Sequence, residues 1–210
     1  MRNTPLTTLT GRLAPLMRAN IDTDAIFPSR SKMGVDETDV SRFLFREWRL
    51  TDDGQERPEF VLNQPSRRNA VFLIALDNFG CGSSRETAPW ALRDFGIRCI
   101  VAPSFGSIFQ ANCYRNGIAP VVLDRKYVET LGSIAENDDA MTMTLDLATQ
   151  VLATSGGWRV SFAMPSGAKA MLMEGLDTIG VTLTRRTEIE AFQRNDVSGR
   201  PWVYVESLNG

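Results

Sequence analysis

The middle of the chain alternates between short apolar runs and segments with helical spacing. Three runs are rich in apolar and β-branched residues: 69–76, 97–102 and 118–123. Between them lie two segments with helical patterns, residues 84–95 before Gly96 and a segment opening at Ser104 that carries Ile108, Phe109 and Tyr114 on one side and closes at Asn116 and Gly117. Such runs are typical of strands buried on both faces, and glycine favours a helix C-terminus. The pattern predicts a parallel βαβαβ sheet with right-handed crossovers, whose ligands bind beyond the carboxyl ends of the strands.

The flanking segments predict a larger mixed domain around this core. Residues 6–13 have the pattern of a strand, and residues 20–24 that of a turn in which Asp and Asn side chains bond their own backbone. Further along, residues 141–147 and 151–162 predict a hairpin around residues 155–157, while 166–174 and 187–194 have helical patterns. Residues 30–65 are polar and lack a strong period, which predicts either a long functional loop or a small subdomain.

Composition places the chain among ordinary globular proteins, and we expect residues 1–210 to form one domain. The chain is 43% hydrophobic and 23% charged, and its formal net charge is -2. Without an excess of cations, nucleic acid and anionic membranes are poor candidates for partners. The longest apolar run, residues 70–76, is too short to span a bilayer, and the first residues lack a secretory signal. We therefore expect a cytoplasmic protein.

The counts of histidine and cysteine exclude several kinds of chemistry. The chain has no histidine, so it cannot supply a histidine base, a Ser-His-Asp triad or a histidine-ligated metal. Cys81, Cys99 and Cys113 are odd in number and widely spaced, which is typical of reduced thiols and gives no C-x-x-C metal pair. We expect no metal site in this chain.

Residues 78–86, which read Asn-Phe-Gly-Cys-Gly-Ser-Ser-Arg-Glu, are the strongest candidate for a binding loop. The two glycines allow the backbone to approach a ligand where a helix begins. Ser83 and Ser84 add hydroxyl groups, and Arg85 can bind a carboxylate with two parallel hydrogen bonds. The loop therefore predicts a site for a carboxylate.

A purely structural interpretation of the same residues is also open. Ser83 and Glu86 have the spacing of a capping box for a helix that begins at Ser84. Pro89 would then lie inside the helix and remove a backbone hydrogen bond, so the helix can instead begin at Thr87 with Pro89 in its first turn.

Other ligand motifs fit less well. Residues 80–85 lack the Gly-Lys-Ser/Thr of a phosphate-binding loop, and Arg85 stands where a dinucleotide fingerprint has its third glycine. Asp22 and Asp24 could bind a cation, but the calcium-loop pattern is incomplete, and aspartates that cap a turn are favoured.

Several motifs together carry a resemblance to a known family. They are residues 20–28, residues 78–86 with Ala88, Pro89 and Trp90, residues 102–105 with Asn112, Asn116 and Gly117, and residues 45–49 and 175–180. In this order they closely resemble the small subunits of 3-isopropylmalate dehydratases, which are similar to the mobile swivel domain of aconitase. The resemblance runs from about Leu9 to Ala191. It implies a three-layer β/β/α swivel domain.

The resemblance also implies an activity and a partner. Family members are hydro-lyases of leucine biosynthesis whose [4Fe-4S] cluster is held by a separate large subunit, while the small subunit closes over a dicarboxylate substrate. By this resemblance Ser83 is the base that removes a proton as an alkoxide, and Asp24 supports it. Ser84 and Arg85 hold a substrate carboxylate, and Thr23 is a further substrate-binding residue. An alkoxide would need preorganised donors in a site closed to water.

The chain departs from the family pattern at three places. Thr87 stands where the family usually has histidine, Asp36 and Glu37 stand where basic residues usually reach the substrate, and residues 163–169 lack the usual aromatic and basic run. Acidic side chains repel a dicarboxylate. Two alternatives therefore stay open: a hydro-lyase for another hydroxy-dicarboxylate, of the methylmalate or citraconate type, and a non-catalytic subunit that only binds a partner.

Overall fold

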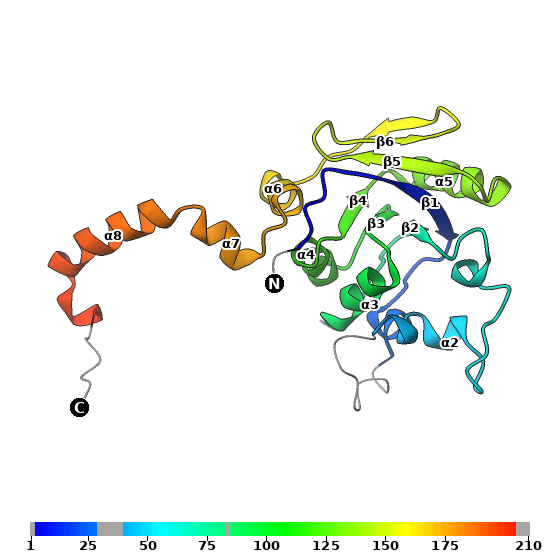
Figure 1. Ribbon diagram of the computed structural model, residues 1–210, viewed down its shortest axis with the longest axis horizontal. Helices are drawn as coiled ribbons and strands as arrows, with labels where there is room; N and C mark the ends of the chain where they lie inside the picture. The colour runs from blue at the N-terminus through cyan, green and yellow to red at the C-terminus, as the bar shows by residue number, and fades with distance from the viewer. Residues whose placement is uncertain (1–2, 29–39, 83–84, 205–210) are drawn as a thin grey trace.

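A seven-stranded sheet forms the centre of the molecule in the computed structural model, which describes residues 3–28, 40–82 and 85–204 (Figure 1). Its strands are β1 (Thr8–Leu16), β2 (Ala70–Ala75), β3 (Cys99–Ala102), β4 (Ala119–Val122), β5 (Thr142–Asp146), β6 (Val151–Thr154) and β7 (Arg159–Ser161). The order is β4-β3-β2-β1-β5-β6-β7, parallel from β1 to β4 and antiparallel from β5 onward. The predicted parallel βαβαβ unit is confirmed in β2 to β4.

Helices and helical turns fill the connections. They are α1 (Thr23–Ile26), η2 (Ser41–Phe43), α2 (Arg46–Arg49), η3 (Val61–Asn63), α3 (Thr87–Phe95), α4 (Ser107–Arg115), α5 (Arg125–Asn137), α6 (Ser166–Glu174), α7 (Thr178–Leu183), α8 (Arg186–Gly199) and η4 (Pro201–Val203). Helix α3 begins at Thr87, which is the second of the two starts that the sequence allows, and ends at Gly96 with φ 110°. Among the described residues no helix is both long and apolar enough to cross a membrane.

Side chains of the parallel strands alternate between two core faces. Leu73 and Ile100 pack with α3 and α4 on one face, while Phe72 and Val101 pack with α5 and the antiparallel strands on the other. This alternation follows from the two-residue period of a strand and explains why the strands are apolar throughout. The sheet curls so that β5 and β6 lie over the second face (Figure 1).

Residues 40–64 are packed against the core and do not form one open loop. The turns η2, α2 and η3, together with the residues that flank them, contribute these buried apolar residues: Val40, Leu44, Phe45, Phe60, Val61 and Leu62. Residues 29–39 lie outside the described residues. The substrate-facing loop expected at about 30–65 therefore stays a prediction only for the residues before 40. The organisation of residues 1–210 as a single domain also stays a prediction.

Three local expectations were wrong. Helix α4 begins at Ser107 and not at Ser104, and Ile108 is 51% exposed because it faces away from buried Phe109. Residues 155–157 form the turn between β6 and β7, so the segment 151–162 contains two strands instead of one. Helix α5 was not expected at all.

Candidate functional site

Three loops meet at the carboxyl edge of the parallel strands. Because β1, β2 and β3 are parallel neighbours, the segments that follow them leave the sheet at the same edge. Backbone bonds join the first two loops: Asn20 N donates to Asp77 O at 2.8 Å, Gly80 N to Ile21 O at 2.7 Å and Thr23 N to Cys81 O at 2.9 Å. Phe79 exchanges bonds with the third loop, through Ser104 O at 3.1 Å and Gly106 N at 2.9 Å. The middle loop is therefore fixed on both sides.

Two asparagines hold the turns at the base of these loops. Asn20 and Asn78 have φ values of 56° and 60°, in the left-handed region that asparagine tolerates. Asn78 Nδ2 donates to Asn20 Oδ1 at 2.9 Å, and the Asn78 amide donates to Ser104 Oγ at 2.8 Å. Short polar side chains thus connect the turns of different loops, whereas the predicted bond of a side chain of residues 20–24 to its own backbone is made by Asp22.

Gly80 is required by its contact with the protein itself. A Cβ atom on Gly80, whose φ is 73°, would lie 2.1 Å from the buried ring of Phe109. Gly82 is different, because it is exposed and its nearest contact would be the Cβ of Asp22 at 3.6 Å. Of the two glycines, only Gly82 therefore lies at the surface.

Arg85 and Asp24 form a two-point ion pair across the first two loops. Arg85 Nη2 donates to Asp24 Oδ2 at 2.7 Å, and Nη1 donates to Oδ1. The side chain of Arg85 is 15% exposed and that of Asp24 is 50% exposed. The structure thus brings these two predicted site residues together, with the guanidinium held by a carboxylate of this chain.

The neighbours of Asp24 have mainly structural contacts. Asp22 is the N-cap of α1, and its Oδ1 accepts a hydrogen bond from Ala25 N at 2.7 Å. Of Asp22 and Asp24, the two aspartates considered as cation ligands, Asp22 is therefore explained by its capping role. Thr23 is 2% exposed, and its backbone O accepts from Phe27 N at 3.0 Å. A substrate-binding role for Thr23 stays a prediction.

Ser83 and Ser84 lie outside the described residues, so their roles stay predictions. The start of α3 does bear on the alternative interpretation. Its N-cap is Glu86, whose side chain makes no capping bond, whereas a capping box with Ser83 needs a helix that begins at Ser84. The capping-box interpretation of this motif is therefore wrong. Thr87, at the start of α3, has a buried Oγ1 without a hydrogen-bond partner among the described residues.

The cysteines do not form a metal centre. Cys99 and Cys113 are buried on opposite faces of the sheet, and Cys81 lies in the middle loop. Burial and the nearby Asp22 carboxylate raise the pKa of the Cys81 thiol, so it stays protonated at neutral pH. No group of three or more His, Cys, Asp or Glu residues that could hold a metal is found among the described residues. This set does not fit a [4Fe-4S] cluster.

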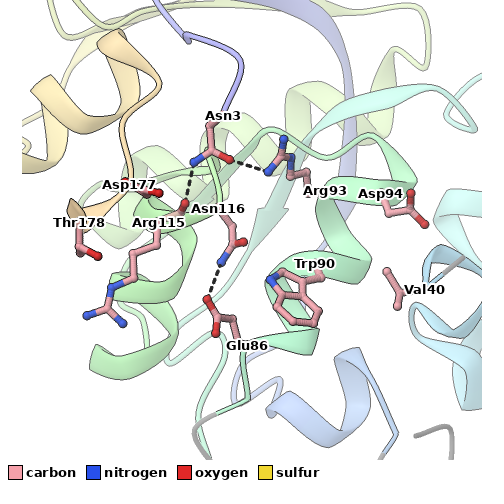
Figure 2. A pocket seen from close by; sticks show the side chains of 10 residues that line it. All are labelled: Asn3, Val40, Glu86, Trp90, Arg93, Asp94, Arg115, Asn116, Asp177 and Thr178. Atoms are coloured by element: carbon pink, nitrogen blue, oxygen red, sulfur yellow. Dashed lines mark hydrogen bonds between the residues drawn. The ribbon is translucent and has the colours of Figure 1, made fainter. Parts of the chain in front are cut away.

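A pocket of about 620 Å³ opens beside the start of α3 (Figure 2). Glu86 faces Asn116 across it, with Asn116 Nδ2 donating to Glu86 Oε1 at 3.5 Å, and Arg93 Nη1 donates to Asn3 Oδ1 at 2.6 Å. Asp177 lines the far wall. Sequence reasoning did not identify this pocket, because Asn3 and Asp177 come from opposite ends of the chain.

Comparison with known proteins identifies the family. Residues 3–126 match the family model described as the aconitase C-terminal domain. The 3-isopropylmalate dehydratase small subunit of Roseobacter denitrificans is 48% identical over 197 residues, which cover 94% of this chain and 98% of that protein. The chain belongs to the 3-isopropylmalate dehydratase small-subunit family. The small subunit of Cereibacter sphaeroides is 47% identical over the same shares of the two chains.

A solved structure supports the fold of this small-subunit family member. The crystal structure of 3-isopropylmalate dehydratase from Methanocaldococcus jannaschii matches with a TM-score of 0.63 and 24% identity, covering 89% of this chain and 99% of that one. The swivel-domain fold that the resemblance implies is thus confirmed, with a curled sheet that places the antiparallel strands as a second β layer.

Proposed function

We propose that this chain is the small subunit of a 3-isopropylmalate dehydratase, active when joined to a large subunit. The enzyme would interconvert 2- and 3-isopropylmalate by removing water across a carbon–carbon bond and adding it back. The observation that carries this proposal is the 48% identity to a small subunit of that name over 94% of the chain. The fixed loops and the Arg85–Asp24 pair at the sheet edge supply a matching site.

Within the proposed site, Ser83 takes the proton from the carbon beside a substrate carboxylate. The leaving proton and hydroxide together make one water, and the electron pair of the C–H bond becomes the double bond. A serine hydroxyl ordinarily keeps its proton, so the reaction needs donors that stabilise the alkoxide in a site closed to water. Ser84 and Arg85 hold the carboxylate that flanks this carbon.

Arg85 retains donors for a substrate while it is bound to Asp24. A guanidinium has five N–H groups, and the pair with Asp24 uses one on each Nη atom. The Nε hydrogen and the outer hydrogen of the Nη atom on the same side remain for a carboxylate on the adjacent edge. Asp24 therefore acts as a positioning residue that fixes the plane of the Arg85 fork.

We assign the [4Fe-4S] cluster to the large subunit, since the cysteine set of this chain does not fit one. The cluster supplies Lewis-acid chemistry at the substrate hydroxyl when it is bound there. The contribution of this chain is to bind, orient and deprotonate the substrate. We place the complex in the cytoplasm, where the biosynthetic enzyme would meet its small-molecule substrate.

The test is reconstitution with the purified large subunit. Iron content and dehydration of 2-isopropylmalate, followed by the absorbance of the unsaturated product, are measured for each subunit alone and for the mixture. We expect turnover only in the mixture. Turnover by this chain alone, or none in the mixture, would contradict the proposal. Parallel assays with methylmalate and citraconate measure the alternative substrate class, which the departures at Thr87, at Asp36 and Glu37, and at residues 163–169 leave open.

A further inference from the structure

The last helices form an arm that extends away from the body of the molecule (Figure 1). We define the C-terminal arm as residues 178–204, which comprise α7, α8 and η4. None of these three elements contains a buried residue. The arm therefore gains its order from local helical bonds and from its attachment point, and not from burial in this chain.

The base of the arm is firmly attached. Helix α6 buries Leu172 against the sheet layer and ends at Gly175, whose O accepts a hydrogen bond from Asn3 N at 3.0 Å. Asp177 then caps α7, with Gly180 N donating to Asp177 Oδ1 at 2.6 Å. The arm leaves the body at a defined residue, so its surface is presented at a fixed place.

The exposed apolar side chains of the molecule are concentrated on this arm. Of the ten large apolar residues that are exposed among the described residues, seven lie on the arm: Ile179, Val181, Leu183, Phe192, Val197, Trp202 and Val203. Trp202 is 71% exposed and Phe192 is 60% exposed. Between α7 and α8 the arm also forms a hollow of about 610 Å³ lined in part by Val181, Ile189 and Phe192. Concentrated apolar surface of this kind marks a protein–protein interface.

The accessible area also indicates a missing partner. The chain exposes 11578 Å², whereas a compact monomer of 23.3 kDa exposes about 9,700 Å². The excess of about 1,900 Å² is more than the roughly 800 Å² that each partner buries in a stable interface. The excess belongs to the chain as a whole, and it is enough for an interface of ordinary size.

Two observations indicate which partner covers the arm. Only three of the exposed large apolar residues among the described residues, Ile108, Val122 and Tyr127, lie on the body, so the body offers less apolar surface than the arm itself for the arm of a second copy. The arm begins at Thr178, which together with Asp177 lines the same pocket as Glu86, the residue after Arg85 (Figure 2). A chain that covers the substrate loops would therefore reach the arm directly.

We propose that the C-terminal arm docks into an apolar groove on the large subunit and holds it over the substrate loops. This inference rests on the proposed function. The arm carries the apolar anchors of the interface, while the loops at the sheet edge face the reacting substrate. Loss of the arm contacts should weaken association of the subunits without changing the chemistry in a complex that is fully assembled.

The test uses the full chain with three arm substitutions, Leu183→Ser, Phe192→Ser and Trp202→Ser, and the purified large subunit. None of these side chains is buried, so the variant should fold, and circular dichroism with a thermal melt checks this. We expect the Kd for the large subunit to rise about a hundredfold or more, while kcat at saturating large subunit stays within about threefold. The control, Glu136→Ser with Asp139→Ser at exposed positions near the C-terminal end of α5 and away from the substrate loops, should bind normally.

The outcomes separate this inference from the proposed function. Equal Kd values for the arm variant and the unmodified chain would overturn the docking role while leaving the proposed function intact. Failure of the unmodified chain to bind the large subunit would overturn both. Light scattering on this chain alone should show a monomer, and a dimer that the arm substitutions dissociate would instead identify a second copy as the occupant.

Discussion

Arg85 and Asp24 are 61 positions apart in sequence and meet through two parallel hydrogen bonds. Their meeting depends on the backbone bonds that tie the loop after β1 to the loop after β2. Because the Asp24 carboxylate is 50% exposed, water screens the pair and its contribution to stability is about 1 kcal/mol or less. Its value lies in orientation, since it fixes the plane in which Arg85 offers its remaining donors.

Asp24→Asn tests this positioning role. The amide keeps one acceptor but loses the charge and the second parallel bond, so Arg85 should lose orientation. In the assembled enzyme we expect KM for isopropylmalate to rise about tenfold with a smaller change in kcat. Steady-state kinetics measures both. Glu136→Gln, at an exposed position near the C-terminal end of α5, should leave both constants unchanged. An unchanged KM for Asp24→Asn would contradict the assignment.

Arg85→Lys should raise KM more than Asp24→Asn does. Lysine keeps the positive charge but lacks the planar fork that binds two carboxylates on adjacent edges. If Asp24 acts only through Arg85, the double variant should be no worse than Arg85→Lys alone. The kinetic double-mutant cycle measures this coupling. Strictly additive effects would mean that the two residues act separately.

The fold was largely predictable because burial on both faces leaves a strong sequence signal. The apolar runs that became β2, β3 and β4 have no polar positions on either face. Helix α5 was missed although it carries a usable signal, since Val128, Leu131 and Ala135 recur at helical spacing and all are buried. Residues 40–64 were misjudged for the opposite reason. Their buried apolar residues are scattered among charged ones, so composition hides the packing.

The site was predictable as a set of residue types and not as a geometry. The motif of residues 78–86 indicates a carboxylate loop, but no local pattern shows that Asp24 occupies one edge of Arg85. The structural need for glycine at position 80 could not be predicted either. The ring that leaves no room for a side chain there belongs to Phe109 on α4, which is distant in sequence. Contacts between loops that are distant in sequence follow from the sheet order, which becomes known only with the fold.

Gly80→Ala should destabilise the protein strongly. The new Cβ would meet the Phe109 ring at 2.1 Å, and φ of 73° is strained for alanine. We expect a loss of about 3 kcal/mol or more in the free energy of unfolding, measured by urea denaturation. Gly54→Ala is the matched control, because Gly54 has φ 84° and a methyl group added there would meet no atom within 4 Å. It should cost only about 1 kcal/mol. Equal losses would mean that the Phe109 contact relaxes freely.

Alkylation of Cys81 should report the electrostatics of the loop. Burial and the Asp22 carboxylate raise the pKa of this thiol above its ordinary value of 9.0, so the reactive thiolate forms only at higher pH. Cys99 and Cys113 are fully buried and should not react in the folded protein. Asp22→Asn keeps the helix cap but removes the charge, so the pH midpoint of alkylation by iodoacetamide should fall. Asp77→Asn, which removes a carboxylate paired with Arg125, should leave the midpoint unchanged.

Ser83→Ala tests the proposed proton transfer directly. If Ser83 removes the proton, its loss should lower kcat by several orders of magnitude, while subunit association and melting temperature stay close to those of the unmodified protein. A merely structural serine would instead lower the melting temperature by a few degrees and leave turnover of the folded fraction near normal. Ser133→Ala, at an exposed position on α5, controls for loss of a hydroxyl. Kinetics on the correctly folded variant in complex with its large subunit separates the two cases, and near-normal kcat would remove Ser83 from the mechanism.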